Sequence, residues 1–323
     1  MSTIIDVAKT AGVSTATVSR VINNSGRINA DTVKKVLDAM DALNYHPNTI
    51  ARSLVKGHND CIGFLLPDLN MPFWAKLAHD VEKVARSYGY TIMISTAPKD
   101  LDAYIEAYNR LAGSMVCGII TNHIIGSCDF IRASRIPTIT IANTNSDHSI
   151  TSNDHQGGLF ATKHLISRGC KYIVHISGEL SKERSANART YAFEEECKRT
   201  GTKYRIYEVM ISTQVELDYG EIISKIFYEN EGMDGIFASN DMVASTSLST
   251  ALSLGYKVPQ DIKIIGYDDI PVSSMVYPPL TTIRQDYAKL ASTSVESVLK
   301  LIKGEPVPAI QEFPVELIVR GTT

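Results

Sequence analysis

Small hydroxyl-bearing side chains surround a single arginine near the start of the chain. The spacing of Val18 and Ile22 predicts a short helix over residues 15–23, and Ser14 is placed to accept a hydrogen bond from its first free N–H groups. The exposed positions of that helix are Thr15, Ala16, Thr17, Ser19 and Arg20. Slim side chains let a helix approach bases closely, and arginine can donate two hydrogen bonds to guanine. The pattern favours contact with a DNA major groove.

Two further helices are predicted to position this one. The first covers residues 4–10, and Gly12 ends it because a residue without a Cβ enters the left-handed conformation at little cost. The next covers residues 31–44 and is capped by Asp31. Its apolar stripe consists of Val33, Val36, Leu37, Met40 and Leu43. We predict a compact three-helix head, and the alternative is a plain helical hairpin inside a larger core.

Residues 47–59 form a segment that is too short to hold a helix alone in water. Pro47 breaks the preceding helix, and Asn48 is a suitable N-cap. Ala51 and Leu54 then share one side of two helical turns. We expect order only against a second chain or a DNA minor groove, where an exposed leucine can wedge between base steps. An ordinary interdomain linker is the alternative, but such linkers are usually richer in glycine, serine and proline.

The composition is that of a globular chain with room for more than one domain. Its 323 residues are 44% hydrophobic and 21% charged, with a formal net charge of −3. Residues 1–59 carry seven lysines and arginines against four aspartates, so a head of charge +3 precedes an acidic body. This distribution predicts that DNA binding is confined to the head.

The five cysteines are scattered without a C-x-x-C pair, which is typical of buried free thiols in a reducing cytoplasm. They are Cys61, Cys117, Cys128, Cys170 and Cys197. The first residues lack a charged start followed by an apolar run, so we expect no signal peptide. No apolar run is long enough to span a bilayer, and the eight histidines lack metal-ligand spacing. We therefore expect a cytoplasmic protein without a metal or a cofactor.

From Cys61 onward, short apolar segments alternate with helical ones. The predicted strands are 61–67, 91–96, 116–121 and 138–142 in the first half, and 172–178, 204–210, 235–240 and 263–269 in the second. Such alternation produces parallel sheets with right-handed crossovers. The tail adds a strand at 280–284, a helix at 286–303 and a strand at 312–320, which can cross between the halves. We predict an α/β core of two similar, Rossmann-like lobes.

In open parallel sheets, ligands bind beyond the carboxyl ends of the strands. The polar and aromatic residues near those ends are Phe73, Trp74, Asn122, Asn143, Arg189, Asn240 and Asp268, with Asp154 and Tyr287 near the lobe crossings. Carboxylates, amides and arginine hold pairs of sugar hydroxyls, and an aromatic ring stacks on the C–H face of a sugar. Taken singly, an aspartate after a strand is more often a helix cap, and an aromatic residue more often belongs to a core. Their shared position favours a small-sugar site.

The motifs do not favour catalysis. The sequence contains no glycine-rich nucleotide-binding motif, nucleophile elbow or zinc-protease motif. Asp268 and Asp269 could be taken for paired catalytic carboxylates, but adjacent residues in an extended segment point apart. A sugar-modifying enzyme is one alternative. A sugar-binding protein of transport is another, and it is disfavoured by the missing export signal and the DNA-binding head.

The run DVAKTAGVSTATVSRVIN, followed by LNYHPNTIARSL, closely resembles the LacI/GalR family of bacterial transcription repressors. By that resemblance the base-reading positions are Thr15, Ala16 and Arg20. The positions near phosphates are Ser14, Thr17, Ser19 and Asn23. Leu54 would be the minor-groove lever of a hinge helix that also contains Asn48 and Ala51.

The layout of the remaining chain is similar to the family's periplasmic-binding-protein-like (type I) core. The implied domains are a helix-turn-helix domain at 1–46, a hinge helix and linker at 47–59, and an effector-binding core at 60–323. The N-lobe would take about 60–156 and 286–311, and the C-lobe about 157–285 and 312–323. The positions that align with effector contacts are Asn122, Arg189, Asn240 and Asp268, with Trp74 and Tyr287.

One departure from the family pattern concerns the ligand. Several relatives place an aspartate after the fourth strand, where this chain has Ala142 and Asn143. The segments PFWAKL, SNDHQGG and VHISG are most similar to the sucrose and ribose repressor branches. The choice of sugar or sugar phosphate therefore stays open.

The resemblance also implies a mechanism. A homodimer would pair two heads on a near-palindromic operator, and a small sugar between the lobes would move the points from which the hinges emerge. The chain is thus predicted to be a repressor without enzymatic activity. A regulator that answers to a phosphoprotein corepressor at the outer face of the first lobe is the alternative. We do not expect a tetramer, because no leucine-heptad tail follows the last strand.

Overall fold

The computed structural model describes residues 2–22, 25–45, 59–97, 100–122, 127–142, 146–180, 185–209 and 219–323. The chain divides into two compact units, Met1–Asn59 and Asp60–Thr323. The predicted hinge helix lies almost entirely outside the described residues, so its conformation stays a prediction.

The first unit is a three-helix head with its own apolar core. Its helices are α1 (Ile4–Ala11), α2 (Thr15–Ile22) and α3 (Ala30–Ala42). Val7, Val18 and Val36, one from each helix, are fully buried against one another. Removing these side chains from water is the main force that holds three such short helices together. The predicted three-helix head is confirmed.

Two details of the third helix differ from prediction. Asp31 is not its cap, because the Asn29 side chain accepts a hydrogen bond from the Asp31 N–H at 3.0 Å and the helix begins one residue earlier. Leu37 is 48% exposed, so its place in the apolar stripe is wrong. Ala39 is buried instead of Leu37, because α3 needs a small side chain where it packs closely against the other two helices.

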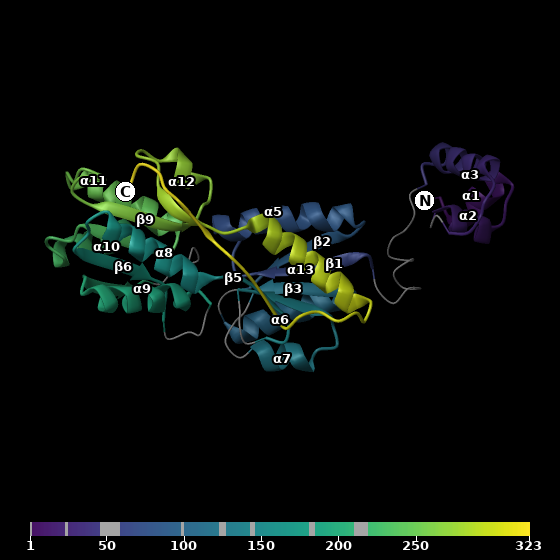
Figure 1. The fold of residues 1–323 in the computed structure, drawn as a ribbon. Coiled ribbons are helices and arrows are strands. Elements are labelled where there is room, and N and C mark those ends of the chain that lie inside the picture. Colours follow the sequence, from purple (N-terminus) through teal and green to yellow (C-terminus); the bar gives the residue numbers. More distant parts are fainter. Residues whose placement is uncertain are drawn as a thin grey trace. The chain divides into compact units, whose positions relative to one another are not determined.

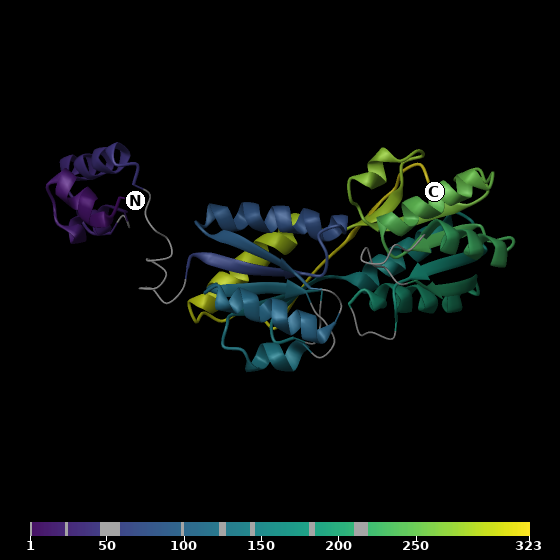
Figure 2. The ribbon, with the colours of Figure 1, turned by 180° about the vertical axis from the view of Figure 1, so that it is seen from behind.

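The second unit contains two α/β lobes, and the first of these, the N-lobe, has a sheet of order β11-β5-β4-β3-β1-β2 (Figure 1). Its strands are β1 (Cys61–Leu66), β2 (Thr91–Thr96), β3 (Gly118–Asn122), β4 (Thr138–Ile141), β5 (Ser149–Ser152) and β11 (Ile310–Phe313). One face is covered by α5 (Pro72–Ser87) and α13 (Tyr287–Ile302) and the other by α6 (Leu101–Gly113) and α7 (Ser127–Ala133), as Figure 2 also shows.

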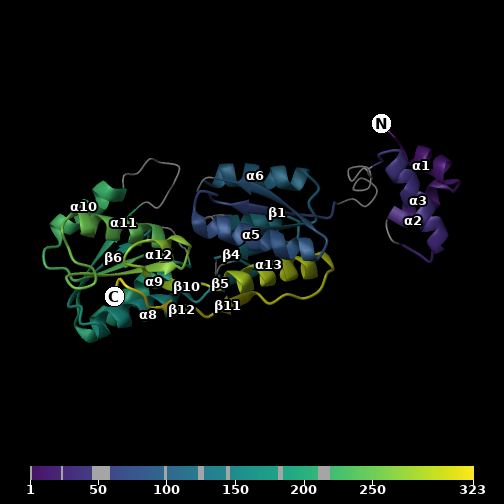
Figure 3. The ribbon, with the colours of Figure 1, turned by 90° about the horizontal axis from the view of Figure 1, so that it is seen from above.

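The C-lobe repeats this plan with the order β12-β10-β9-β8-β6-β7. Its strands are β6 (Tyr172–Ser177), β7 (Lys203–Glu208), β8 (Gly235–Ala238), β9 (Lys263–Asp268), β10 (Thr281–Arg284) and β12 (Glu316–Ile318). Figure 3 shows α8 (Asp154–Ser167) and α9 (Asn187–Thr200) on one side of this sheet, and α10 (Tyr219–Glu229) and α11 (Asp241–Ser253) on the other. The short α12 (Val272–Met275) follows β9. The predicted pair of parallel α/β lobes is confirmed.

The single strand predicted over 312–320 is wrong. The chain leaves the N-lobe sheet after β11, which pairs with β5 in parallel, and enters the C-lobe sheet as β12, which pairs with β10 in antiparallel fashion. Pro314 lies at the break and has no N–H to donate to either sheet. The strand β5 was not predicted, because its sequence SITS is too polar to stand out as an apolar run.

Three connections join the lobes, namely β5 to α8, β10 to α13, and β11 to β12 (Figure 1). Two of them are hydrogen-bonded to each other. The Asn153 N–H donates to the Phe313 carbonyl at 2.8 Å, and its side-chain amide donates to Glu312 at 2.7 Å. The Val315 N–H donates to the Gln156 side chain at 3.2 Å. The lobes are thus linked by several hydrogen-bonded backbone segments rather than by one flexible connection.

Cys61, Cys117, Cys170 and Cys197 are buried free thiols, as predicted, and the burial of the Cys128 side chain lies outside the description. Burial raises the pKa of Cys117 to about 11 and that of Cys170 and Cys197 to about 12, so these thiols are unreactive at neutral pH. Among the helices in the described ranges, none is long and apolar enough to cross a membrane.

Candidate effector site and DNA-reading head

The turn between α1 and α2 has the tight geometry that the sequence predicts. Gly12 has φ +65°, and the Val13 N–H donates to the Ala8 carbonyl at 3.0 Å. Ser14 then caps α2, since its Oγ accepts a hydrogen bond from the Thr17 N–H at 3.1 Å. This cap fixes the direction in which the leading end of α2 leaves the turn.

The outer face of α2 carries the side chains that the sequence analysis assigned to DNA. Ser14, Thr15, Ala16 and Arg20 are exposed, and Thr17 and Ser19 are half-buried. Fully buried Val18 anchors the opposite face. The small side chains and the one guanidinium of α2 can therefore contact a DNA groove while the head stays folded. The other assigned residues, Asn23, Asn48, Ala51 and Leu54, lie outside the described residues.

The side chain of Arg189, in the first turn of α9, is held in place by two hydrogen bonds and a ring contact. It is only 9% exposed, its Nε donates to Asp154 Oδ1 at 2.7 Å, and its Nη1 donates to the Ser239 carbonyl at 2.7 Å. Its guanidinium lies 3.4 Å from the centroid of the Tyr267 ring, which is a cation–π contact. Burial alone would lower the pKa of Arg189, but the charge of Asp154 raises it above the ordinary value, so the side chain stays cationic.

Two glycines of α8 allow these groups to approach. A Cβ on Gly158 would lie 2.3 Å from the Arg189 carbonyl oxygen, and a Cβ on Gly157 would lie 2.3 Å from the Tyr267 hydroxyl. Both distances are far below van der Waals contact. The Gly-Gly pair therefore sets the spacing between α8, α9 and β9.

Two carboxylates, Asp268 and Asp241, are buried at the ends of the neighbouring strands β9 and β8. Asp268, with φ +104°, accepts a hydrogen bond from the Gln285 side chain at 2.7 Å. Burial raises the pKa of Asp268 to about 7, although Arg189 and the Gln285 hydrogen bond act in the opposite direction. Asp241 is fully buried and accepts from the Ile270 N–H at 2.9 Å. Burial, and then the charge of Asp268, raise the pKa of Asp241 well above its usual range.

Asp269 is not part of a carboxylate pair with Asp268. Its oxygens accept from Arg284 Nε and Arg320 Nη2, each at 2.7 Å. Burial would raise the pKa of Asp269, but hydrogen bonds from Arg284, Arg320 and Ser273 lower it. The predicted separation of the two carboxylates is observed, but its reason was wrong, because both residues have positive φ rather than an extended backbone.

An aromatic group from the N-lobe side completes the cluster. Phe73 and Trp74 meet edge to face at 5.0 Å between ring centroids, and Phe73 lies 5.4 Å from Tyr287. Burial raises the pKa of Tyr287, and the charges of Asp268 and Asp241 raise it further. The charges of Asp268 and Arg189 both act on the pKa of Tyr287, which supports placing this aromatic group near the two C-lobe side chains.

The assigned amides have mixed outcomes. Asn122 ends β3 and is buried at the carboxyl edge of the N-lobe sheet. Asn240 is a helix cap, because its Oδ1 accepts from the Val243 N–H at 2.9 Å. Asn143 lies outside the described residues.

Sequence reasoning missed several members of the cluster. Asp241 follows Asn240 directly and lies at the same strand end, but only Asn240 was assigned as an effector contact. Tyr267 lies inside a strand, and Ser239 contributes only its backbone carbonyl to Arg189. No sequence signal marks these two.

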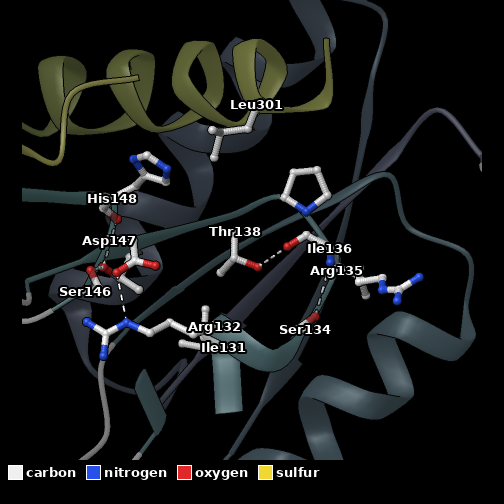
Figure 4. Close-up of a pocket in the computed structure, with 12 residues that line it drawn as sticks. Ile131, Arg132, Ser134, Arg135, Ile136, Thr138, Ser146, Asp147, His148 and Leu301 are labelled. Carbon is white, nitrogen blue, oxygen red and sulfur yellow. Dashed lines mark hydrogen bonds and ion pairs between the residues drawn. The ribbon is translucent and has the colours of Figure 1, made fainter. Parts of the chain in front are cut away.

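A separate hollow of about 250 Å³ lies on the N-lobe (Figure 4). Arg132, Thr138, His148 and Leu301 are among the residues that line it. The charge of Arg132 is already partnered, since its Nε donates to Asp147 at 2.9 Å. The hollow lies where β4 begins, whereas the candidate cluster lies where strands end, so it is not the predicted effector site.

A helix-turn-helix head and a two-lobed α/β core with a polar cluster at its strand ends define the class of DNA-binding regulators that have a periplasmic-binding-protein-like core. Residues 3–48 match the family model "Bacterial regulatory proteins, lacI family", and residues 162–323 match "Periplasmic binding protein-like domain". The chain belongs to the lacI family of bacterial regulatory proteins, and it is a transcriptional regulator rather than an enzyme.

Two of the relatives that match along the full length are ribose operon repressors. The one of Halalkalibacterium halodurans is 33% identical and the alignment covers 100% of this chain and 97% of the relative. That of Bacillus subtilis is 34% identical, with 100% and 99% covered. The solved structure of the lac repressor dimer bound to operator and the anti-inducer ONPF is 28% identical, with a TM-score of 0.88 over 99% of this chain and 98% of that one. The two ribose operon repressors support the ribose part of the predicted similarity to the sucrose and ribose branches.

Proposed function

We propose that this chain acts in the cytoplasm as a homodimeric repressor whose operator affinity is switched by a small sugar bound between the lobes. The supporting observation is the fixed Arg189, which Asp154 and the Ser239 carbonyl hold beside Asp268. A cationic donor, a carboxylate acceptor and nearby aromatic rings are the groups that hold sugar hydroxyls and the C–H face of a sugar ring. The names of the relatives make D-ribose the first sugar to test.

In this proposal the C-lobe binds the sugar hydroxyls and the N-lobe contacts the face of the sugar ring. Arg189 and Asp268 bind adjacent hydroxyls, and Phe73 and Trp74 stack on the ring. Asn122, Asn143, Asn240 and Tyr287 would complete the polar contacts. Closure or rotation of the lobes about their three connections then moves the points where the two hinges leave the core.

The DNA side of the proposal rests on the head. Thr15, Ala16 and Arg20 read bases in each half of a near-palindromic operator. Ser14, Thr17, Ser19 and Asn23 contact phosphates, and the hinge with Asn48, Ala51 and Leu54 enters the minor groove. The exposed outer face of α2 supports the first of these assignments.

The proposal is tested by operator binding with and without sugars. Fluorescence anisotropy of an operator duplex should change when D-ribose or another member of a sugar panel is added to the purified protein. Arg189→Ala should abolish this response, because it removes the cationic donor that Asp154 and the Ser239 carbonyl hold in place, while sugar-free operator binding shows that the variant is folded. An unchanged response would remove Arg189 from the site. If no sugar changes the operator affinity of the wild type, control by a protein corepressor is favoured.

Leu54→Ala should separate the two binding functions. We expect it to weaken operator binding about tenfold or more, because a minor-groove wedge stabilises the bent duplex. Sugar affinity, measured by calorimetry without DNA, should not change. Equal loss of both affinities would contradict the assignment of Leu54 to DNA.

A further inference from the structure

A buried histidine and two hydroxyl groups form a hydrogen-bonded chain under the candidate site. His175 is fully buried in β6, with its ring stacked on Phe237 at 4.5 Å between centroids. Its Nδ1 lies 2.8 Å from the Phe237 carbonyl oxygen, and its Nε2 lies 2.9 Å from Thr190 Oγ1. Thr190 Oγ1 is in turn 2.9 Å from Ser177 Oγ. The proposed function assigns no role to this chain of groups.

The direction of every bond in this chain is fixed by its first member. A carbonyl oxygen only accepts, so His175 Nδ1 must carry the proton that points to Phe237. Burial lowers the pKa of His175 to about 4, and the charge of Arg189 acts in the same direction, so the ring is neutral at pH 7. Its Nε2 therefore has a lone pair and must accept from the Thr190 hydroxyl.

The same reasoning continues to Ser177. The single hydroxyl proton of Thr190 is used on His175, so Thr190 Oγ1 can only accept from Ser177. The single hydroxyl proton of Ser177 is then used as well. Toward any further group, Ser177 Oγ can therefore act only as a hydrogen-bond acceptor.

Ser177 ends β6 at the edge where the candidate ligand groups gather. The neighbouring strand β8 continues there into Ser239, whose N–H donates to the Ile176 carbonyl at 2.9 Å and whose own carbonyl binds Arg189. Ser177 thus lies one strand away from the carbonyl that holds Arg189, and the guanidinium of Arg189 can only donate hydrogen bonds. A ligand hydroxyl that reaches both groups would accept from Arg189 and donate to Ser177.

We propose that His175 is a positioning residue that, through Thr190, holds Ser177 as a hydrogen-bond acceptor for an effector hydroxyl beside Arg189. The proposal rests on the proposed sugar site for its ligand, but not for the direction of the bonds. It selects a ligand that donates at this point and disfavours one with only acceptors there, such as an ether oxygen or a carboxylate.

The first test needs no ligand. Long-range 1H–15N spectra of histidine side chains in the full-length protein should show His175 neutral at pH 7, with the proton on Nδ1 and a hydrogen-bonded, unprotonated Nε2. Thr190→Val should shift the Nε2 resonance, because it removes the donor, and Thr190→Ser should restore it. Thr246→Val is the matched control, since that hydroxyl binds only the Met242 carbonyl of its own helix. A proton on Nε2, or an imidazolium, would overturn the proposal.

The second test uses D-ribose and calorimetry on the same variants. Thr190→Val should lower the affinity by up to about tenfold, the upper end of what one hydrogen bond contributes, and Thr190→Ser should recover most of it. In a Ser177→Ala background, Thr190→Val should have no further effect, because its action passes through Ser177. Additive losses would refute that route. A wild type that binds no sugar would refute the proposed function, and the spectra would then decide alone whether Ser177 is held as an acceptor.

Discussion

At the scale of single residues, Asp268 makes the candidate site sensitive to pH. Its pKa is raised from 3.8 to about 7 because the folded protein buries the carboxyl group. The folded state therefore holds this proton more tightly than the unfolded chain. Its contribution to stability is complete below the unfolded pKa and is lost as the pH rises through 7. Replacement of Asp268 by asparagine removes this ionisation and leaves an acceptor for Gln285.

We therefore expect Asp268→Asn to be more stable relative to wild type at pH 8 than at pH 5. The stability of the variant relative to wild type should rise by about 2–3 kcal/mol from pH 5 to pH 8, because the folded wild type loses the Asp268 proton over that interval. Urea unfolding at both pH values measures it. The same difference at pH 5 and pH 8 would show that Asp268 is ionised throughout.

Asp269 supplies the matched control, because the sign of its shift is opposite. Hydrogen bonds from Arg284 and Arg320 outweigh burial and lower its pKa, so its stabilisation is present above the unfolded pKa and is lost in acid. Asp269→Asn should therefore be less stable than wild type at pH 8. The difference between Asp269→Asn and wild type should be the same at pH 5 and pH 8, unlike that of Asp268→Asn, because Asp269 is ionised in both the folded and the unfolded state over that interval.

At the scale of secondary-structure elements, the sequence predicted what apolar periodicity controls. The strand β1 is an uninterrupted apolar run that is buried along its whole length, and it was predicted to within a residue. The strand β5 was missed because its serines and threonines are buried by neighbours that the sequence does not show. The break at Pro314 was missed because alternation alone does not reveal that a chain changes sheets.

The packing of α8 against α9 gives a prediction at this scale. Gly158→Ala should lower the free energy of unfolding by about 1–3 kcal/mol, because its Cβ would meet the Arg189 backbone and force the helices apart. Chemical unfolding followed by circular dichroism measures the loss. Gly113→Ala, in α6, is the control, since a Cβ there meets nothing within 4 Å. That variant should be neutral or more stable by up to about 1 kcal/mol. Equal effects of the two substitutions would contradict the close contact.

At the scale of the whole molecule, the sequence indicated where a site would form but not how it is held. The rule that ligands bind at strand ends selected Arg189 and Asp268, and in the structure the charge of each acts on the pKa of the other. The groups that fix them were not predictable in the same way. Tyr267 acts through the face of its ring and Ser239 through its backbone carbonyl, and both depend on the registration of strands far apart in the sequence.

The coupling between the two units provides the last prediction. If a sugar changes operator affinity by some factor, the operator must change sugar affinity by the same factor, because both describe one free energy of coupling. Calorimetric titration of D-ribose into the protein, alone and with saturating operator duplex, should therefore give dissociation constants whose ratio equals the change in operator affinity. Couplings of this kind are usually about 1–3 kcal/mol, a ratio of about 5 to 150. A duplex of scrambled sequence controls for charge alone. If the operator does not change the sugar affinity, the core binds sugar and the head binds DNA independently. The proposed switch would then be absent.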